Sequence, residues 1–93
     1  MYEWDKTKNK SNEQKHGLSF EVALEVFSDP KAIVQFNREI NGEQRDEVIG
    51  QLDGCLVVVF VVFTKRMQKI RIISARKANK QERLLYESQT RTD

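Results

Sequence analysis

The feature that most constrains the fold of this chain is a run of nine apolar residues from Cys55 to Phe63. The run is too short to cross a bilayer, which takes about 18 apolar residues or more. It is rich in Val and Phe, which favour strands, and apolar side chains occupy both alternating positions. The pattern predicts a strand over residues 55–64 that is buried on both faces and lies at the centre of a sheet.

Two shorter β-prone runs, residues 32–36 and 47–52, precede this strand. The polar segment 37–43 between them is expected to form the loop of a hairpin. The Asp53-Gly54 pair then predicts a two-residue turn, because Asp and Gly readily adopt the positive φ that such turns need. These three strands are therefore expected to pair antiparallel.

A fourth strand is expected over residues 69–74, after a turn at residues 65–68. Alternation places Ile70 and Ile72 on one face of this strand. It places Arg71 and Ile73 on the other face.

The N-terminal part predicts a short strand over residues 2–4 and then helices. Residues 5–16 contain no large apolar side chain and form either a surface helix or a disordered segment, with Gly17 suited to the helix end. Ser19 is a good N-cap for a second helix, which must end by Asp29 because the residue before Pro30 avoids helical dihedrals. The apolar face of this second helix consists of Phe20, Ala23, Leu24 and Phe27.

The C-terminal part predicts one more helix. Asn79 and Glu82 have the spacing of a capping box, and the helix is expected to reach about residue 86 before a frayed tail. The resulting order of elements is typical of an α+β domain spanning residues 1–93, with a four-stranded, mostly antiparallel sheet and a short N-terminal strand. One face of the sheet is expected to be covered by helices and the other to be open and to carry Arg71.

The net charge is only +2, which by itself does not indicate nucleic acid as the partner. The distribution of charge is more informative. Residues 65–83 hold eight basic residues and one acid, whereas residues 39–53 hold five acids and one Arg. The C-terminal third is therefore expected to offer an electropositive surface suited to phosphates.

Several classes of protein are disfavoured by what the sequence lacks. Cys55 is the only cysteine, so no internal disulfide forms and an inert core thiol is expected. The N-terminus has no secretion-signal pattern, which predicts a cytoplasmic protein without a membrane segment. No spacing of His, Cys or carboxylates suggests zinc and no Gly-rich loop suggests a nucleotide, so neither metal nor cofactor is expected.

Three blocks of residues, in order and spacing, resemble the BrnT family of bacterial toxins. The first consists of Trp4, Asp5, Lys8, Asn12, Lys15, His16, Gly17, Ser19, Phe20, Glu21 and Ala23. The second consists of Gly42, Glu43, Gln44 and Arg45 with Ile49 and Gly50. The third runs from Ile70 to Ala78 and continues with Glu82, Arg83, Leu85, Tyr86 and Glu87.

The resemblance implies a RelE-like fold and a ribonuclease activity that arrests translation. It also implies neutralisation by a BrnA-type antitoxin in a hetero-oligomer, with operator DNA contacted only through that antitoxin. The chain departs from BrnT-type toxins at Asp46, where they usually carry an aromatic residue. A carboxylate beside Arg45 would either tether this arginine or repel RNA.

Cleavage of RNA without a metal uses the neighbouring 2′-hydroxyl as nucleophile and requires a base, an acid and fixed positive charge. Arginine suits the third task because its guanidinium binds two phosphate oxygens at once. On the resemblance, Arg71 and Arg76 are the best candidates, followed by Arg45. From the pattern alone, Arg71 would be an exposed strand residue paired with an acid.

The proton-transfer candidates are His16 and Glu47. His16 is the only histidine, and histidine suits proton transfer near neutral pH; alternatively it interacts with the carbonyl end of its helix. Glu47 is a possible base if it shares a face with Arg71, and otherwise an edge-strand carboxylate.

Lys15, Lys69 and Tyr86 are candidates for binding the RNA. Lys15 either binds phosphate or is simply solvated, and Lys69 belongs to the same basic region as Arg71. Tyr86 either stacks on a base or donates a proton to the leaving group, or it is a packing residue of the last helix.

Two other classes of function remain besides the enzyme. The first is an interaction protein whose main role is to bind the antitoxin and co-regulate its operon. The second is a small structural protein that binds nucleic acid, which the modest net charge disfavours.

Overall fold

The computed structural model describes residues 1–52 and 56–90, so the predicted Asp53-Gly54 turn and Cys55 lie outside the described residues. The elements in chain order are β1 (Tyr2–Glu3), α1 (Lys6–His16), α2 (Phe20–Ala23), the 3₁₀ helix η1 (Leu24–Ser28), β2 (Ile33–Ile40), β3 (Glu43–Gln51), β4 (Val58–Arg66), β5 (Lys69–Lys77) and α3 (Lys80–Thr90). The α+β class is confirmed, and the arrangement is compatible with the RelE-like fold. No helix in these two ranges is both long and apolar enough to cross a membrane.

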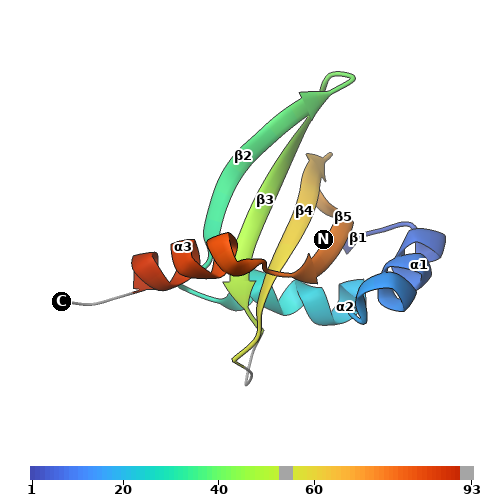
Figure 1. Ribbon diagram of the computed structural model, residues 1–93. Helices are drawn as coiled ribbons and strands as arrows, with labels where there is room; N and C mark the ends of the chain where they lie inside the picture. Colours follow the sequence, from blue (N-terminus) through green and yellow to red (C-terminus); the bar gives the residue numbers. More distant parts are fainter. Residues whose placement is uncertain (53–55, 91–93) are drawn as a thin grey trace.

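The strands form one five-stranded sheet in the order β1-β5-β4-β3-β2. Strands β2 to β5 pair antiparallel, and β1 adds to the edge of β5 in parallel. The predicted central strand is β4, with β5 and the short β1 on one side and β3 and β2 on the other. It runs from Val58 to Arg66 rather than over residues 55–64, and Leu56 and Val57, predicted to be buried in it, are exposed before its start. Helices α1 and α2 lie behind the sheet and α3 crosses in front of it (Figure 1).

The main core lies between the sheet and α2 with η1. Val59, Val61 and Phe63 of β4 are buried on this side, in one cluster with Phe20 and Val26. The remaining members of the cluster are Leu18, Ala23, Val48, Leu52, Ile72 and Ala75. The apolar positions of β4 thus specify which face the helices cover.

A second, smaller cluster lies on the opposite face and consists of Ile49, Phe60 and Tyr86. Tyr86 belongs to α3, so this helix covers part of the face that the sequence predicted to be open. The prediction of an open face is therefore wrong for the part around Ile49 and Phe60. Helix α3 also extends to Thr90 rather than to about residue 86.

The first hairpin is tighter than predicted. Strands β2 and β3 extend to Ile40 and from Glu43, so only Asn41 and Gly42 form the turn instead of the segment 37–43. Both turn residues have positive φ, 51° and 78°, as a two-residue hairpin turn requires. The Asn41-Gly42 pair is a strong sequence signal for such a turn, and it lies inside the segment 37–43 that was predicted to be a longer loop.

Strand β5 is longer than predicted and contains a β-bulge. Val62 of β4 pairs with Ser74, but the next residue, Phe63, pairs with Ile72, so Ile73 is the extra residue. A bulge of this kind inverts the alternation beyond it. The bulge therefore decides which side chains the second half of β5 presents to each face.

Helix α1 is ordered without an apolar face. The carboxylate of Asp5 caps its N-terminus by accepting from the Lys8 amide, and Gly17 ends it with a φ of 69°. The buried side chain of Asn12 donates to the carbonyl oxygens of Leu18 (2.9 Å) and Ala75 (2.7 Å) and accepts from the Ala75 amide (3.3 Å). Buried hydrogen bonds to the edge of β5 thus replace the apolar contacts that usually hold a helix.

The predicted helix caps at Ser19 and Asn79 are confirmed. The Ser19 hydroxyl accepts from the Val22 amide, and the helix that it starts ends at Asp29, although its second half is 3₁₀ rather than α. Asn79 and Glu82 form a reciprocal capping box, with each backbone amide donating to the other side chain at 2.8 Å.

Candidate active site

A row of polar and charged positions crosses the part of the sheet face that α3 leaves uncovered. Residues directly opposite one another on paired strands, antiparallel or parallel, point to the same face of a sheet. The row consists of Arg38 on β2, Arg45 on β3, Thr64 on β4, Arg71 on β5 and Glu3 on β1. Three arginines from three strands are therefore aligned on one face.

Glu47 lies on the same face, two residues along β3 from Arg45. Its register partner on β2 is Gln35, whose amide donates to the Glu47 carboxylate at 2.8 Å. The condition set for a base, that Glu47 share a face with Arg71, is met by the register of β3, β4 and β5.

Arg76 occupies the same face beyond Glu47. It pairs with Phe60 in register, and its guanidinium carbon lies 4.2 Å from the centre of the Phe60 ring. Both of its terminal nitrogens donate to the Glu82 carboxylate, at 2.8 and 2.9 Å. Burial opposes ionisation of Glu82, but the hydrogen bonds from Arg76 and the Asn79 amide outweigh it and hold the pKa of Glu82 below its ordinary value.

The arginines at the far end of the face are also close to carboxylates. Arg71 contacts Glu3 at 3.3 Å, with about a quarter to a third of each side chain exposed. Arg66 pairs with Glu43, and this hydrogen bond lowers the pKa of the Glu43 carboxyl, helped by the charges of Arg45 and Arg71. The field around Glu43 is thus set by several cations together.

Arg45 contributes an unusual group to this face. Its Nε is buried and has no hydrogen-bond partner among the residues that the structure describes. An unsatisfied buried donor of a charged group is costly, so an anion that reached it would be favoured.

Lys69 lies at the exposed start of β5, on the same face as Arg71, because the two are two positions apart within the regular part of the strand. His16 and Lys15 are exposed at the C-terminal end of α1, outside the row. Among the described residues, no hydrogen bond or ion pair joins His16 to the sheet arginines.

Tyr86 is buried between α3 and the sheet. Its hydroxyl donates to Asp29 at 2.6 Å, and burial together with this carboxylate raises the pKa of Tyr86 to about 12. These contacts are those of a packing residue of the last helix, rather than of a side chain that stacks on a base or donates a proton.

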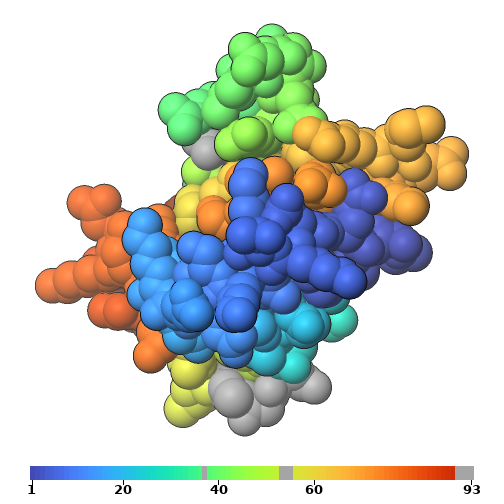
Figure 2. Space-filling view, turned by 90° about the vertical axis from the view of Figure 1, so that its right-hand side faces the viewer, coloured from blue at the N-terminus to red at the C-terminus, as the bar shows by residue number. Residues whose placement is uncertain are grey.

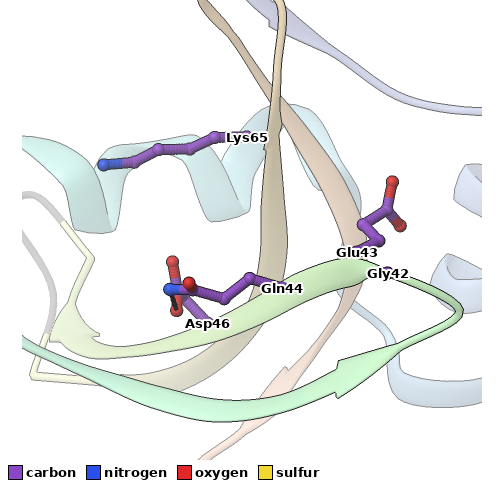
Figure 3. A pocket seen from close by; sticks show the side chains of 5 residues that line it. All are labelled: Gly42, Glu43, Gln44, Asp46 and Lys65. Atoms are coloured by element: carbon purple, nitrogen blue, oxygen red, sulfur yellow. Dashed lines mark hydrogen bonds between the residues drawn. The ribbon is translucent and has the colours of Figure 1, made fainter.

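Asp46 does not contact Arg45, although the two are adjacent in sequence. Alternation turns Asp46 to the helix side of the sheet, where it is buried and accepts from the Gln44 side chain at 2.8 Å. Figure 3 shows Asp46 and Gln44 together, with Lys65 extending on the same side. The possibility that Asp46 tethers Arg45 is therefore wrong.

Sequence reasoning missed Arg38, Arg66 and the carboxylates Glu3 and Glu43 as parts of this face. Their side chains converge only through the pairing register of the strands. The two-residue turn at Asn41 and Gly42 sets this register for Arg38 and Glu43, whereas Glu3 is placed by the pairing of β1 with β5. Among the described residues, no group of three or more His, Cys or carboxylate side chains is arranged to hold a metal ion.

A small α+β domain whose sheet presents aligned arginines and a carboxylate on one face has the features of a protein that acts on phosphodiesters. A family model described as the ribonuclease toxin BrnT of type II toxin-antitoxin systems matches residues 4–82. The chain belongs to this family of ribonuclease toxins, whose type implies an antitoxin protein as partner. A search of curated proteins gave no match.

Proposed function

We propose that this chain is a metal-independent endoribonuclease that cleaves RNA in the cytoplasm and thereby arrests translation and growth. The observation that carries the proposal is the placement of Arg45, Arg71 and Arg76 on one sheet face with Glu47 between them. Guanidinium groups supply fixed positive charge, and the carboxylate supplies a base, so the face combines two of the three groups that the reaction needs.

In the proposed reaction, a phosphodiester of the RNA binds over Arg45 and Arg71. Glu47 removes the proton of the adjacent 2′-hydroxyl, and that oxygen attacks the phosphorus. The bond from phosphorus to the 5′-oxygen breaks, which leaves a 2′,3′-cyclic phosphate and a 5′-hydroxyl. The arginines stabilise the extra negative charge of the transition state.

His16 is the proposed proton donor to the leaving 5′-oxygen, and Lys15 and Lys69 are proposed to bind flanking phosphates. Helix α1, which carries His16 and Lys15, is attached to the edge of β5 through Asn12 and Ala75. For His16 to protonate the oxygen that leaves a phosphate bound to Arg71, the cleaved phosphodiester must lie at this edge of the sheet, within reach of both side chains.

We further propose that a BrnA-type antitoxin neutralises the chain in a hetero-oligomer and is the only part of the complex that contacts operator DNA. Strand β2 is an edge strand, and Val34 and Phe36 on it are about 60% exposed. Exposed edge strands with apolar side chains are readily covered by a segment of a partner.

The proposal is tested with purified, antitoxin-free protein and a labelled single-stranded RNA in the presence of a metal chelator. Cleavage is expected to persist, and Arg71→Ala and Arg76→Ala are each expected to lower its rate about a hundredfold or more, the usual effect of losing a transition-state donor. Lys10→Ala, at an exposed position of α1, is the matched control. If the RNA stays intact while both variants still arrest growth, the proposal is wrong.

A second candidate is a protein whose main role is to bind its antitoxin without catalysis. This candidate is favoured by two ion pairs, Arg71 with Glu3 and Arg76 with Glu82, because a paired guanidinium is less available to a phosphate. In that case substitution of these arginines changes the stability of the domain or of the complex and leaves RNA untouched.

A further inference from the structure

The helix side of the sheet carries a second site, at the end of the β2–β3 hairpin. A cavity of about 540 Å³, open to solvent, is lined by Gly42, Glu43, Gln44, Asp46 and Lys65. This volume lies within the range of small-ligand pockets. The β2–β3 hairpin stands clear of the helices at the top of the molecule (Figures 1 and 2).

The polar groups in this cavity are arranged around an empty space. Asp46, Gln44 and Lys65 lie on one side of the ribbon, whereas Glu43 points away (Figure 3). Gln44 donates to Oδ1 of Asp46 and so fixes the carboxylate, while Oδ2 has no hydrogen-bond partner in residues 1–52 and 56–90. Lys65 makes no ion pair within the same ranges.

An aromatic ring lies next to these groups. Phe36 is the register partner of Asp46 on β2, so the two side chains share a face, with Cβ atoms expected about 5 Å apart. The Phe36 side chain is 61% exposed, which is unusual for a residue of this size. The cavity thus holds an acceptor and a cation, and Phe36, which does not line it, places an exposed ring beside Asp46.

We propose that this cavity binds a guanine base of the RNA. Guanine presents N1–H and its 2-amino group side by side, and one carboxylate accepts from both donors. Its O6 and N7 accept from a lysine, and its ring stacks on an aromatic side chain. Adenine, cytosine and uracil do not present two adjacent donors beside an acceptor. A phosphate is disfavoured because its negative charge is repelled by the Asp46 carboxylate.

The inference rests on the proposed ribonuclease function and adds a sequence preference to it. Asp46 lies between Arg45 and Glu47 in the chain, but those two side chains point to the opposite face of the sheet. The guanine would therefore be a neighbour of the cleaved nucleotide, on an RNA strand that bends around the sheet at the β2–β3 and β4–β5 turns.

The direct test is a titration of the isotope-labelled full chain with GMP, AMP, CMP and UMP, followed by NMR. GMP is expected to shift the signals of Phe36, Gln44, Asp46 and Lys65 at lower concentration than the other three nucleotides. Asp46→Asn, which exchanges one acceptor for a donor, is expected to weaken GMP binding about tenfold or more. Glu13→Gln, an exposed acid-to-amide change on α1, is the matched control.

Equal binding of the four nucleotides, or unchanged GMP binding by Asp46→Asn, would overturn the proposal. Lys65→Gln provides a second variant at an exposed position, and it too is expected to bind GMP more weakly. Cleavage mapping separates this inference from the function on which it rests. Cleavage at sites without a preference for guanine would contradict the proposed guanine pocket and leave the proposed ribonuclease function intact. An absence of cleavage together with selective binding of GMP would contradict the proposed ribonuclease function.

Discussion

Arg71 and Arg76 lie on the same face of the sheet although they are five positions apart along β5, an odd spacing that places side chains of a regular strand on opposite faces. Their partners on β4, Thr64 and Phe60, are four residues apart and share a face without irregularity. The β-bulge at Ile73 supplies the difference, because its extra residue inverts the alternation between the two arginines. The bulge is therefore part of how the candidate active site is assembled.

Deletion of Ile73 is expected to leave the domain folded, with Arg71 and Arg76 still on one face. Without the extra residue, Ser74 follows Ile72 directly, and the pairs Val62–Ser74 and Phe63–Ile72 become neighbours in a regular ladder. Circular dichroism with thermal unfolding is expected to give a melting temperature within a few degrees of the parent chain. Loss of the folded state would instead show that the bulge itself is required.

Glu3→Gln is expected to increase the affinity for RNA. The Glu3 carboxylate competes with phosphate for Arg71, and the pair is partly exposed, so it is worth little and the gain is at most about fivefold. Fluorescence anisotropy with a labelled RNA whose 2′-hydroxyls are methylated measures binding without cleavage. Weaker binding by this variant would instead identify Glu3 as a residue that orients Arg71.

Asn12→Ala is expected to lower the free energy of unfolding by roughly 2–4 kcal/mol. The substitution leaves the carbonyl groups of Leu18 and Ala75 and the Ala75 amide without their buried partner. Urea unfolding of this variant beside Glu13→Gln, on the exposed side of the same helix, gives the comparison. Equal stability of the two variants would mean that α1 is held in another way.

Tyr86 is expected to make stability depend on pH in the alkaline range. Its pKa is raised in the folded chain, from an ordinary value of 10.0 to about 12, so its contribution is complete below about pH 10. As the pH rises from there towards 12, the folded state holds the proton more tightly than the unfolded state, and this contribution is lost. Tyr86→Phe should remove that part of the decline in unfolding free energy, and an identical decline in both chains would contradict the assignment.

The sequence was sufficient for the elements whose signals are local. The apolar positions of β4, the caps at Ser19 and Asn79 and the left-handed end at Gly17 each depend on a few neighbouring residues, and the structure has them as predicted. The sequence left residues 5–16 as either a helix or a disordered segment. The contact that holds helix α1 joins Asn12 to Ala75, a residue far along the chain, so no local pattern reveals it.

The candidate site was harder to predict because it depends on register. Whether Arg76 faces Glu47 or the core is decided by one extra residue at Ile73, and isoleucine carries no signal for a bulge. The alignment of Arg38 with Arg45 depends on the Asn41-Gly42 turn, which fixes the pairs up to Arg38, and a register shift between Arg38 and Phe36 sets the pairs beyond it. Patterns of neighbouring residues do not determine the pairing register of strands.

The chemistry of the cleaved ends tests the central claim most directly. Single-stranded RNA treated with purified chain in excess chelator is analysed by mass spectrometry. Attack by the 2′-hydroxyl on the face that carries Arg71 and Glu47 predicts 2′,3′-cyclic phosphate and 5′-hydroxyl ends, lost in Arg71→Ala and Glu47→Gln and kept in Lys10→Ala. Products with 3′-hydroxyl and 5′-phosphate ends, or cleavage that stops when metal is removed, would contradict it.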